Sequence, residues 1–300
     1  MNTYTLKNLS EFSRLDEQMI ILWNKKFKLF SEEKIDNKSL FSQKHLKRLI
    51  IVSFLVESNK KHTVEILSKK STSELQVLSE FEIQNYILKN SDYHPLTQLL
   101  ICACFSYDSR FFDSILTICF NKMGIEKCCV DLVFPFLSKM SVILEQYKIQ
   151  ESIISFSKNL IRKHLFYLIK SIPYDEGHNR KWLLFLPENE THDLELLYAY
   201  LFLKMNNEKG IYLGGNQSLK SITECLEHVS ITHTIIYVNK NFDDENVSKH
   251  LALLKKLNPT MTIFVASYEP LKNKITEEIP YINVNTPQMF NSYLQKIISM

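Results

Sequence analysis

Glycine is scarce in this sequence, with 5 residues in 300, whereas an average protein has about 7%. Chemistry that groups several glycines in one loop is therefore nearly excluded. The sequence contains neither G-x-G-x-x-G nor G-x-x-x-x-G-K-[ST], which removes the dinucleotide fingerprint and the P-loop. It also lacks a G-x-S-x-G nucleophile motif, so nothing in it favours an enzyme.

Long apolar runs are missing as well. The longest is Leu196–Leu203, whereas a membrane-spanning helix needs roughly twenty apolar residues. The first residues, MNTYTLKNLSEFSR, contain no apolar signal core. We therefore expect a cytoplasmic protein without a membrane partner.

The third missing feature is C-x-x-C, which argues against a zinc ribbon or a thioredoxin motif. The sequence has six cysteines, and five of them lie in apolar, helix-like sequence. In a reducing compartment such cysteines are expected to be small core residues. The six cysteines of the sequence are Cys102, Cys104, Cys119, Cys128, Cys129 and Cys225.

The charge is unevenly distributed. Residues 1–75 hold 14 Lys and Arg against 9 Asp and Glu, a balance of +5, whereas the remainder holds 22 against 24, a balance of −2. A basic end on a slightly acidic body permits contact with nucleic acid.

Three segments follow from periodicity and capping signals. Residues 1–75 predict two short helices around Ser13–Leu15, the spacing of a helix-turn-helix, then a polar stretch with a turn at 36–38 and two further helices. In residues 76–173, apolar residues recur at the spacing of a helix, which predicts a bundle of four or five helices. Ser71 and Glu74 have the spacing of a capping box, and Pro95 suits a first helical turn.

The third segment, 178–300, alternates strand and helix patterns. Strands are expected at 181–187, 211–214, 234–238, 262–266 and 281–284, with helices between them and a last helix opening at Thr286–Pro287. Five such units predict a doubly wound parallel sheet of the flavodoxin-like type.

This segment order resembles the MerR-type transcription regulators that carry a C-terminal cobalamin-binding domain. The resemblance rests on YTLK at the start, IILWNKKFKL in the second helix, FSQKHLKRL after the polar stretch, and WLLFLPENETHDLELLYAYLFLK followed by IYLGG. It implies a winged helix-turn-helix at 1–75, a helical bundle at 76–173 and a cobalamin-binding-like domain at 178–300.

In these regulators the second helix enters the major groove and a wing lies on the backbone. Compared with their pattern, Ile21, Asn24 and Phe27 replace arginine, glutamate and tyrosine, and Ser39 and Leu40 stand at the wing positions. Trp23 is retained, either as a base contact or as a core anchor. The candidate DNA-contacting residues are Arg14, Trp23, Lys25, Lys26, Lys28, Lys38 and Lys44.

The resemblance also implies a [DE]-x-H-x-x-G loop whose histidine ligates cobalt and whose acid orients that histidine. Here Glu190 and His192 are retained, but Glu195 replaces the glycine. The small residues that make room for the cofactor's nucleotide tail become residues 239–241 and Ala266–Ser267. The Trp and Glu–His pair of the light sensors fall near Leu144, Ile154 and Ser155, so a photosensor is not expected.

The sequence thus predicts a DNA-binding transcriptional regulator of MerR-like type with a repurposed sensor module. It is expected to form a homo-oligomer, because operators of this family are two-fold symmetric, and RNA polymerase is a possible partner. No cofactor is expected. One alternative is an interaction or oligomerisation module that contacts no DNA; another is a regulator that still binds cobalamin, with the cobalt held by His192.

Overall fold

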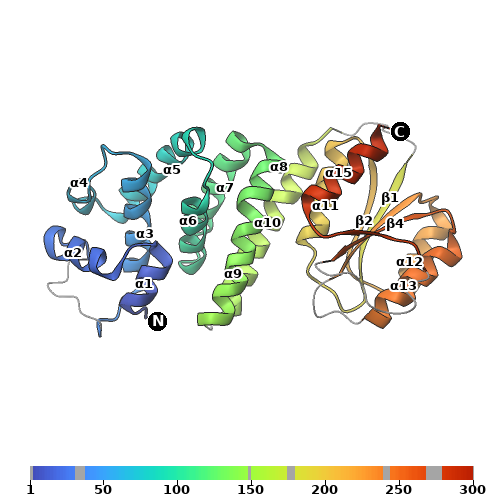
Figure 1. Ribbon diagram of the computed structural model, residues 1–300, viewed down its shortest axis with the longest axis horizontal. Helices are drawn as coiled ribbons and strands as arrows, with labels where there is room; N and C mark the ends of the chain where they lie inside the picture. Colours follow the sequence, from blue (N-terminus) through green and yellow to red (C-terminus); the bar gives the residue numbers. More distant parts are fainter. Residues whose placement is uncertain are drawn as a thin grey trace. The chain divides into compact units, whose positions relative to one another are not determined.

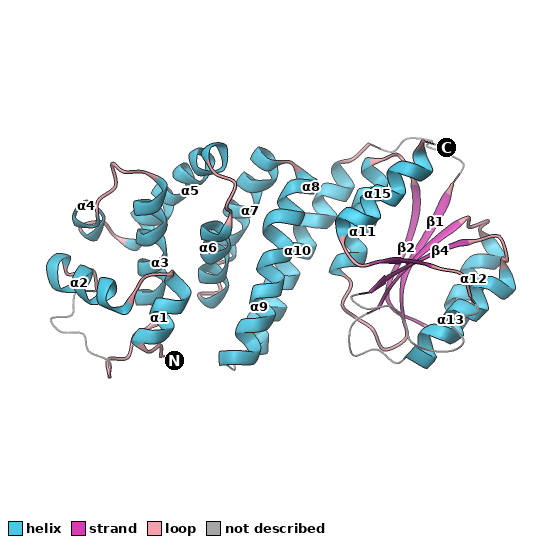
Figure 2. Ribbon diagram, viewed as in Figure 1, coloured by secondary structure: helices cyan, strands magenta, loops and turns pink. Residues whose placement is uncertain are grey.

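A computed structural model describes residues 3–30, 38–147, 150–173, 180–238, 244–267 and 279–299. The chain divides into two compact units, Met1–Leu160 and Ile161–Met300. In the part of the chain that the structure describes, strands of the sheet occur in the second unit and helices occur in both (Figure 2).

The first unit opens with α1 (Leu6–Ser13) and α2 (Glu17–Phe27), as the sequence predicts. The side chain of buried Asn24 closes α2 by accepting the amide N–H of Phe30 at 2.9 Å, and the backbone turns at Lys28 with a φ of 55°. Asn24, which departs from the DNA-reading pattern, therefore has a structural task. An antiparallel bridge between Tyr4 and Phe41 fixes the end of the following segment.

Helices α3 (Gln43–Ser58) and α4 (Val64–Ser68) complete the first part of this unit. Arg48 on α3 donates hydrogen bonds to three backbone oxygens, those of Leu29 at 2.8 Å, Ser68 at 2.6 Å and Lys70 at 2.8 Å. One guanidinium thus ties the end of α2 and the end of α4 to the centre of the unit. The turn predicted at 36–38 lies largely outside the described residues.

A series of helices, all but one of them longer than ten residues, follows in the described part of the predicted bundle region (Figure 1). The capping box at Ser71 and Glu74 is confirmed, as is the early position of Pro95 in its helix. Five of the six cysteines are buried, as predicted, and burial raises the pKa of the Cys102 and Cys119 thiols to about 12, which leaves them unreactive. The helices are α5 (Thr72–Lys89), α6 (His94–Phe105), α7 (Ser109–Met123), α8 (Ile125–Cys128) with a π-helical turn at Cys129–Val133, α9 (Phe134–Tyr147) and α10 (Glu151–Ser171), which continues into the second unit.

The second unit holds a parallel five-stranded sheet in the order β2-β1-β3-β4-β5. This is the flavodoxin-like order that the sequence predicts. The strands are β1 (Lys181–Pro187), β2 (Lys209–Gln217), β3 (His233–Val238), β4 (Thr262–Ser267) and β5 (Ile282–Val284).

Helices cover both faces of this sheet. Helices α11 (Leu194–Met205) and α15 (Pro287–Ile298) lie on one face, and α12 (Leu219–His228) and α13 (Asp244–Leu257) lie on the other (Figure 1). The strands read as near-continuous apolar runs because both faces are buried, and Leu183, Phe185 and Ile236 are fully covered.

One strand prediction is too short. The sequence places the second strand at 211–214, whereas β2 is nine residues long and its pairing with β1 shifts after Leu184. The shift follows from Gly214, whose φ of 80° is left-handed and breaks the regular pleat. Every helix among the described residues is too short or too polar to span a bilayer.

Candidate functional site

The candidate site lies where β1 ends, at the carboxyl edge of the parallel sheet. Ligands of open α/β sheets bind at this edge. Asn216 of β2 holds the loop 188–193 through two hydrogen bonds: its amide N–H donates to the Glu190 carbonyl oxygen at 2.7 Å, and its side-chain oxygen accepts the amide N–H of Asn189 at 2.9 Å. Gly215 permits this close approach, because a Cβ there would meet the Glu190 oxygen at 3.1 Å.

Glu190 and His192 form the chemical centre of the loop. The Glu190 carboxylate is buried, and its Oε1 accepts the amide N–H groups of Thr191 at 2.8 Å and His192 at 2.7 Å. The same oxygen lies 2.7 Å from Nδ1 of His192. A carboxylate oxygen accepts hydrogen bonds, so Nδ1 carries a proton, and in the neutral tautomer that this contact selects the lone pair is on Nε2. The ring is half exposed. This is the arrangement by which a carboxylate orients a metal-binding histidine.

Asp193, the residue that follows His192, is anchored by two side chains from other elements. Its two carboxylate oxygens accept hydrogen bonds from Arg162 at 2.5 Å and from the Tyr212 hydroxyl at 2.9 Å. Burial, followed by the charge of Asp193, raises the pKa of Tyr212, so its hydroxyl keeps its proton and donates. Helix α10, the loop and β2 are thereby joined directly beside His192.

The donor chemistry of the Glu190–His192 pair would suit the cobalt of a corrinoid. Nε2 of His192 has no hydrogen-bond partner among the described residues, and its tautomer is set by Glu190. Glu195 lies partly exposed in the first turn of α11. At the end of β4, Ser267 donates to the Asn283 side chain at 3.0 Å. Residues 239–241, the other positions expected at the nucleotide tail, lie outside the described residues.

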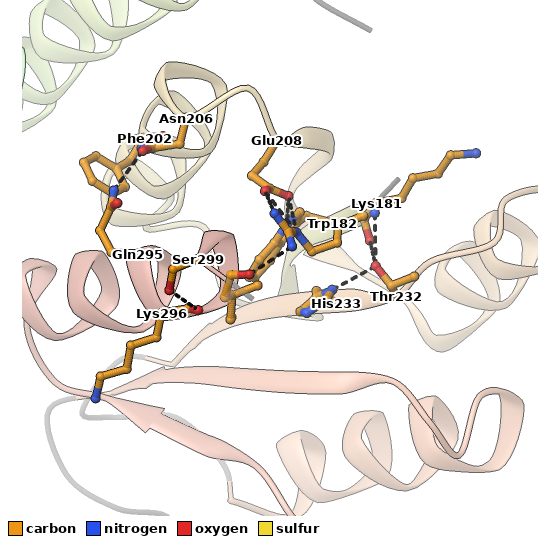
Figure 3. A network of polar contacts seen from close by, with 12 residues as sticks. Lys181, Trp182, Phe202, Asn206, Glu208, Thr232, His233, Gln295, Lys296 and Ser299 are labelled. Atoms are coloured by element: carbon orange, nitrogen blue, oxygen red, sulfur yellow. Dashed lines mark hydrogen bonds and ion pairs between the residues drawn. The ribbon is translucent and has the colours of Figure 1, made fainter. Parts of the chain in front are cut away.

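A second polar network lies at the opposite, amino edge of the sheet (Figure 3). The fully buried Glu208 carboxylate accepts hydrogen bonds from Trp182 Nε1 at 2.8 Å and from Arg180 at 2.7 Å, while another guanidinium nitrogen of Arg180 donates to the Ile297 oxygen at 2.9 Å. His233 stacks on Trp182 with the ring centres 4.5 Å apart. The network joins β1, β2, β3 and α15, and its task is structural.

The predicted DNA-contacting lysines are exposed. Lys25 and Lys26 are in the last turn of α2, and Lys28 follows it. Arg14, Lys38 and Lys44 are exposed as well, and Arg14 lies 3.9 Å from the Asp92 carboxylate. Trp23 is only 9% exposed, which favours its role as a core anchor.

Sequence reasoning missed Asp193, Arg162 and Tyr212, although Asp193 adjoins the predicted histidine. Arg162 and Tyr212 lie 31 and 19 residues from Asp193. No local motif signals such a contact, because the pairing is set by the packing of α10 and β2 on the loop.

Comparisons with known proteins give a structural match but no sequence family. No family model matches the chain, and no curated protein matches it. The monomethylamine corrinoid protein of Methanosarcina barkeri superimposes with a TM-score of 0.56 at 12% identity, covering 68% of this chain and 99% of that one.

Two further structures match less well. A cobalamin-binding protein from Desulfitobacterium hafniense has a TM-score of 0.35 at 9% identity, covering 74% of this chain and 98% of that one. The methanol:cobalamin methyltransferase complex of Methanosarcina barkeri has a TM-score of 0.37 at 9% identity, covering 73% and 84%. The first match, which exceeds 0.5, supports the fold: helices followed by a parallel sheet, as in a cobalamin-binding domain.

Proposed function

We propose that the second unit binds a corrinoid of the cobalamin type and that Nε2 of His192 would hold its cobalt. The observation that carries this proposal is the 2.7 Å contact between His192 Nδ1 and the buried Glu190 carboxylate. Both residues stand at the positions that the sequence resemblance implies, and the fold is that of a corrinoid protein. The retained-cobalamin alternative thus becomes the favoured one.

The contribution of each residue follows from its contacts. Glu190 holds the proton at Nδ1 and so keeps the lone pair of His192 at Nε2, which is the form that binds a metal. Asp193, held by Arg162 and Tyr212, limits movement of the loop. When bound, a corrinoid would supply a cobalt centre that can exchange a ligand. A sensor can use that exchange as a signal.

The test is a titration of the full chain with hydroxocobalamin, followed by visible absorption. We expect a shifted spectrum for the native chain and its loss in His192→Ala. Glu190→Gln should weaken binding about 10–100-fold, as removal of a histidine's carboxylate partner does at other metal sites. His228→Ala, which changes an exposed histidine of the same unit, is the matched control.

Nitrogen isotope labelling sharpens this test. In the reduced Co(II) form, the hyperfine pattern of an axial nitrogen should change when the protein's histidines carry ¹⁵N. An unshifted absorption spectrum with the native chain, or a pattern indifferent to the label, would remove the proposal.

A second candidate function, DNA binding, is favoured by the exposed lysines at the end of α2. Lys25 and Lys26 carry charges that face solvent, as phosphate contacts require. Each lost phosphate contact lowers the dependence of log affinity on log salt by about 0.9. Lys25→Ala/Lys26→Ala should therefore reduce that slope on duplex DNA by about 2, while Lys220→Ala/Lys249→Ala, which removes two exposed lysines of the second unit, should not.

The rival interaction-module hypothesis has an observation of its own. Met19 and Leu22 on the same helix are exposed, and apolar side chains contribute little to phosphate binding. Equal salt slopes for the native chain and the double lysine variant would favour a protein partner at α2 over DNA. The two proposals are compatible, because a regulator can bind a corrinoid through its second unit and DNA through its first.

A further inference from the structure

Helix α13 buries a histidine whose two ring nitrogens both face carbonyl oxygens. This residue, His250, is only 1% exposed. Its Nδ1 lies 2.8 Å from the carbonyl oxygen of Asn246, and its Nε2 lies 3.2 Å from the carbonyl oxygen of Gln217. A carbonyl oxygen only accepts hydrogen bonds, whereas a neutral imidazole has one N–H donor and one acceptor nitrogen. Both contacts are therefore hydrogen bonds only when the ring carries two protons.

The surroundings of the ring suit a cation that is held by dipoles. A charged group inside a protein needs hydrogen bonds to offset its loss of water, and hydrogen bonds from a charged donor are stronger than those from a neutral one. The ring centre of Phe185 lies 5.9 Å from that of His250, within the distance at which an aromatic ring stabilises a cation. Two carbonyl oxygens and one aromatic ring thus surround the imidazole.

The charged side chains of the neighbouring elements lie at the surface. On α13, Glu245 pairs with Lys249 at 3.0 Å, and both are exposed. On α12, Glu224 pairs with Lys220 at 3.7 Å, and both are exposed as well. Glu188, which follows β1, is exposed, and β1 and β2 carry their lysines at their first positions, at the other edge of the sheet. The carbonyl oxygens are therefore the partners that the described residues give to the ring.

The same two carbonyl groups belong to elements that hold the candidate loop. Asn216, the neighbour of Gln217 in β2, makes two hydrogen bonds with the loop 188–193. The side chain of Asn246 donates to the first carbonyl oxygen of this loop at 3.1 Å. His250 therefore joins the two elements, α13 and β2, from which these hydrogen bonds to the loop come.

We propose that His250 is an imidazolium in the folded chain and that it is a positioning residue for the loop that carries His192. One ring N–H holds α13 and the other holds β2. Removing the second proton, or the ring, leaves the Gln217 carbonyl oxygen without a donor and separates the two anchors of the loop. The proposal rests on the proposed function only for the use of the loop, because the imidazolium and its hold on the loop are properties of the chain without a ligand.

The first test measures the protonation of the ring by NMR of the full chain with ¹⁵N-labelled histidine. At about pH 7.5 an ordinary histidine, with a pKa of about 6.5, is mostly neutral, and its two ring nitrogens have widely different chemical shifts. An imidazolium has two similar shifts, which we expect for His250; the signal that disappears in His250→Gln assigns it. His228 is the internal reference, because its Nδ1 also lies 2.8 Å from the carbonyl oxygen four residues earlier, but its side chain is exposed. A neutral pattern for His250 overturns the proposal.

The second test measures the hold on the loop by hydrogen exchange. In His250→Phe, which removes both donors, the amides of Asn189 and Asn216 should exchange at least tenfold faster than in the native chain. His250→Gln, which keeps one donor, should have an intermediate effect, and His228→Phe should have none. The amide of Thr232, which donates to a carbonyl oxygen at the amino edge of the sheet at 3.0 Å, should keep its rate in every variant. Native exchange at the loop in His250→Phe, or faster exchange at Thr232 as well, refutes the positioning role.

A titration with hydroxocobalamin keeps this proposal separate from the proposed function. If the native chain binds the corrinoid, His250→Phe should bind it at least threefold more weakly, and equal binding would count against a role of His250 in positioning the loop. If the native chain does not bind it, the proposed function fails, while the ring shifts and the loop amides still decide the role of His250.

Discussion

Removing the Glu208 carboxylate should be the most damaging polar substitution in the second unit. The side chain is fully buried and accepts hydrogen bonds from Trp182 Nε1 and from two guanidinium nitrogens of Arg180. Glu208→Ala leaves an indole N–H without its acceptor and a guanidinium without its counter-charge. The guanidinium cannot escape by losing its proton, because arginine side chains stay protonated in proteins.

The expected magnitude follows from the burial of the partners. Breaking a buried ion pair by removing one partner costs about 3–5 kcal/mol. Since the Arg180 side chain is 22% exposed and regains some water, we expect the lower end, about 3 kcal/mol. Glu208→Gln keeps an oxygen for the indole and should cost less, so the order of stability is native, Gln, then Ala.

The assay relies on the position of the tryptophans, one in each unit. The two tryptophans, Trp23 and Trp182, lie in different units, so Trp23→Phe leaves a fluorophore that reports the second unit alone. Urea unfolding in that background measures the loss, and Glu224→Ala, which removes an exposed carboxylate of the same unit, is the control. A loss below about 1 kcal/mol, the value of a surface pair, would refute the reasoning.

Three further substitutions test other contacts. Burial lowers the pKa of His233 in the folded chain, so the unfolded chain binds this proton at a higher pH. The stability of the second unit should therefore fall as the pH drops below about 6.5. In His233→Gln, the urea midpoint should depend less on pH over that range. Gly215→Ala puts a Cβ 3.1 Å from a loop carbonyl oxygen and should cost about 1–3 kcal/mol in urea unfolding. Arg48→Lys loses hydrogen bonds to backbone carbonyls and should lower the free energy of unfolding of the first unit by about 2 kcal/mol. The fluorescence of Trp23 during urea unfolding measures this loss.

Local signals predicted most of the fold. Ser71 with Glu74 and Thr286 with Pro287 mark helix starts in the sequence, and both starts are confirmed. Capping succeeds as a signal because it satisfies backbone N–H groups within one turn. The apolar run of β1 likewise predicts a strand covered on both faces. The observed order β2-β1-β3-β4-β5 is the flavodoxin-like one expected for alternating strands and helices of this kind.

The candidate site was predictable only in part, for the same physical reason. Glu190 and His192 are two residues apart, so their pairing depends on local backbone alone. The contact between Asp193 and Arg162 spans 31 residues, and that between Glu208 and Arg180 spans 28. Such contacts depend on which elements the fold brings together, and periodicity carries no information about this.

The hydrogen bonds of Glu190 fix the orientation of His192 before a ligand binds. One of its carboxylate oxygens already accepts the amides of Thr191 and His192 and the ring N–H of His192, so the histidine needs no reorganisation to present Nε2. Ordering this ligand therefore costs little at the moment of binding. For the corrinoid that we propose, the remaining determinant of affinity would be the room for the ring and its nucleotide tail, where Glu195 and Ser267 replace the glycines that the resemblance implies. Glu195→Gly should consequently strengthen hydroxocobalamin binding. A substitution that alters only the orientation of His192 should weaken that binding and cannot strengthen it.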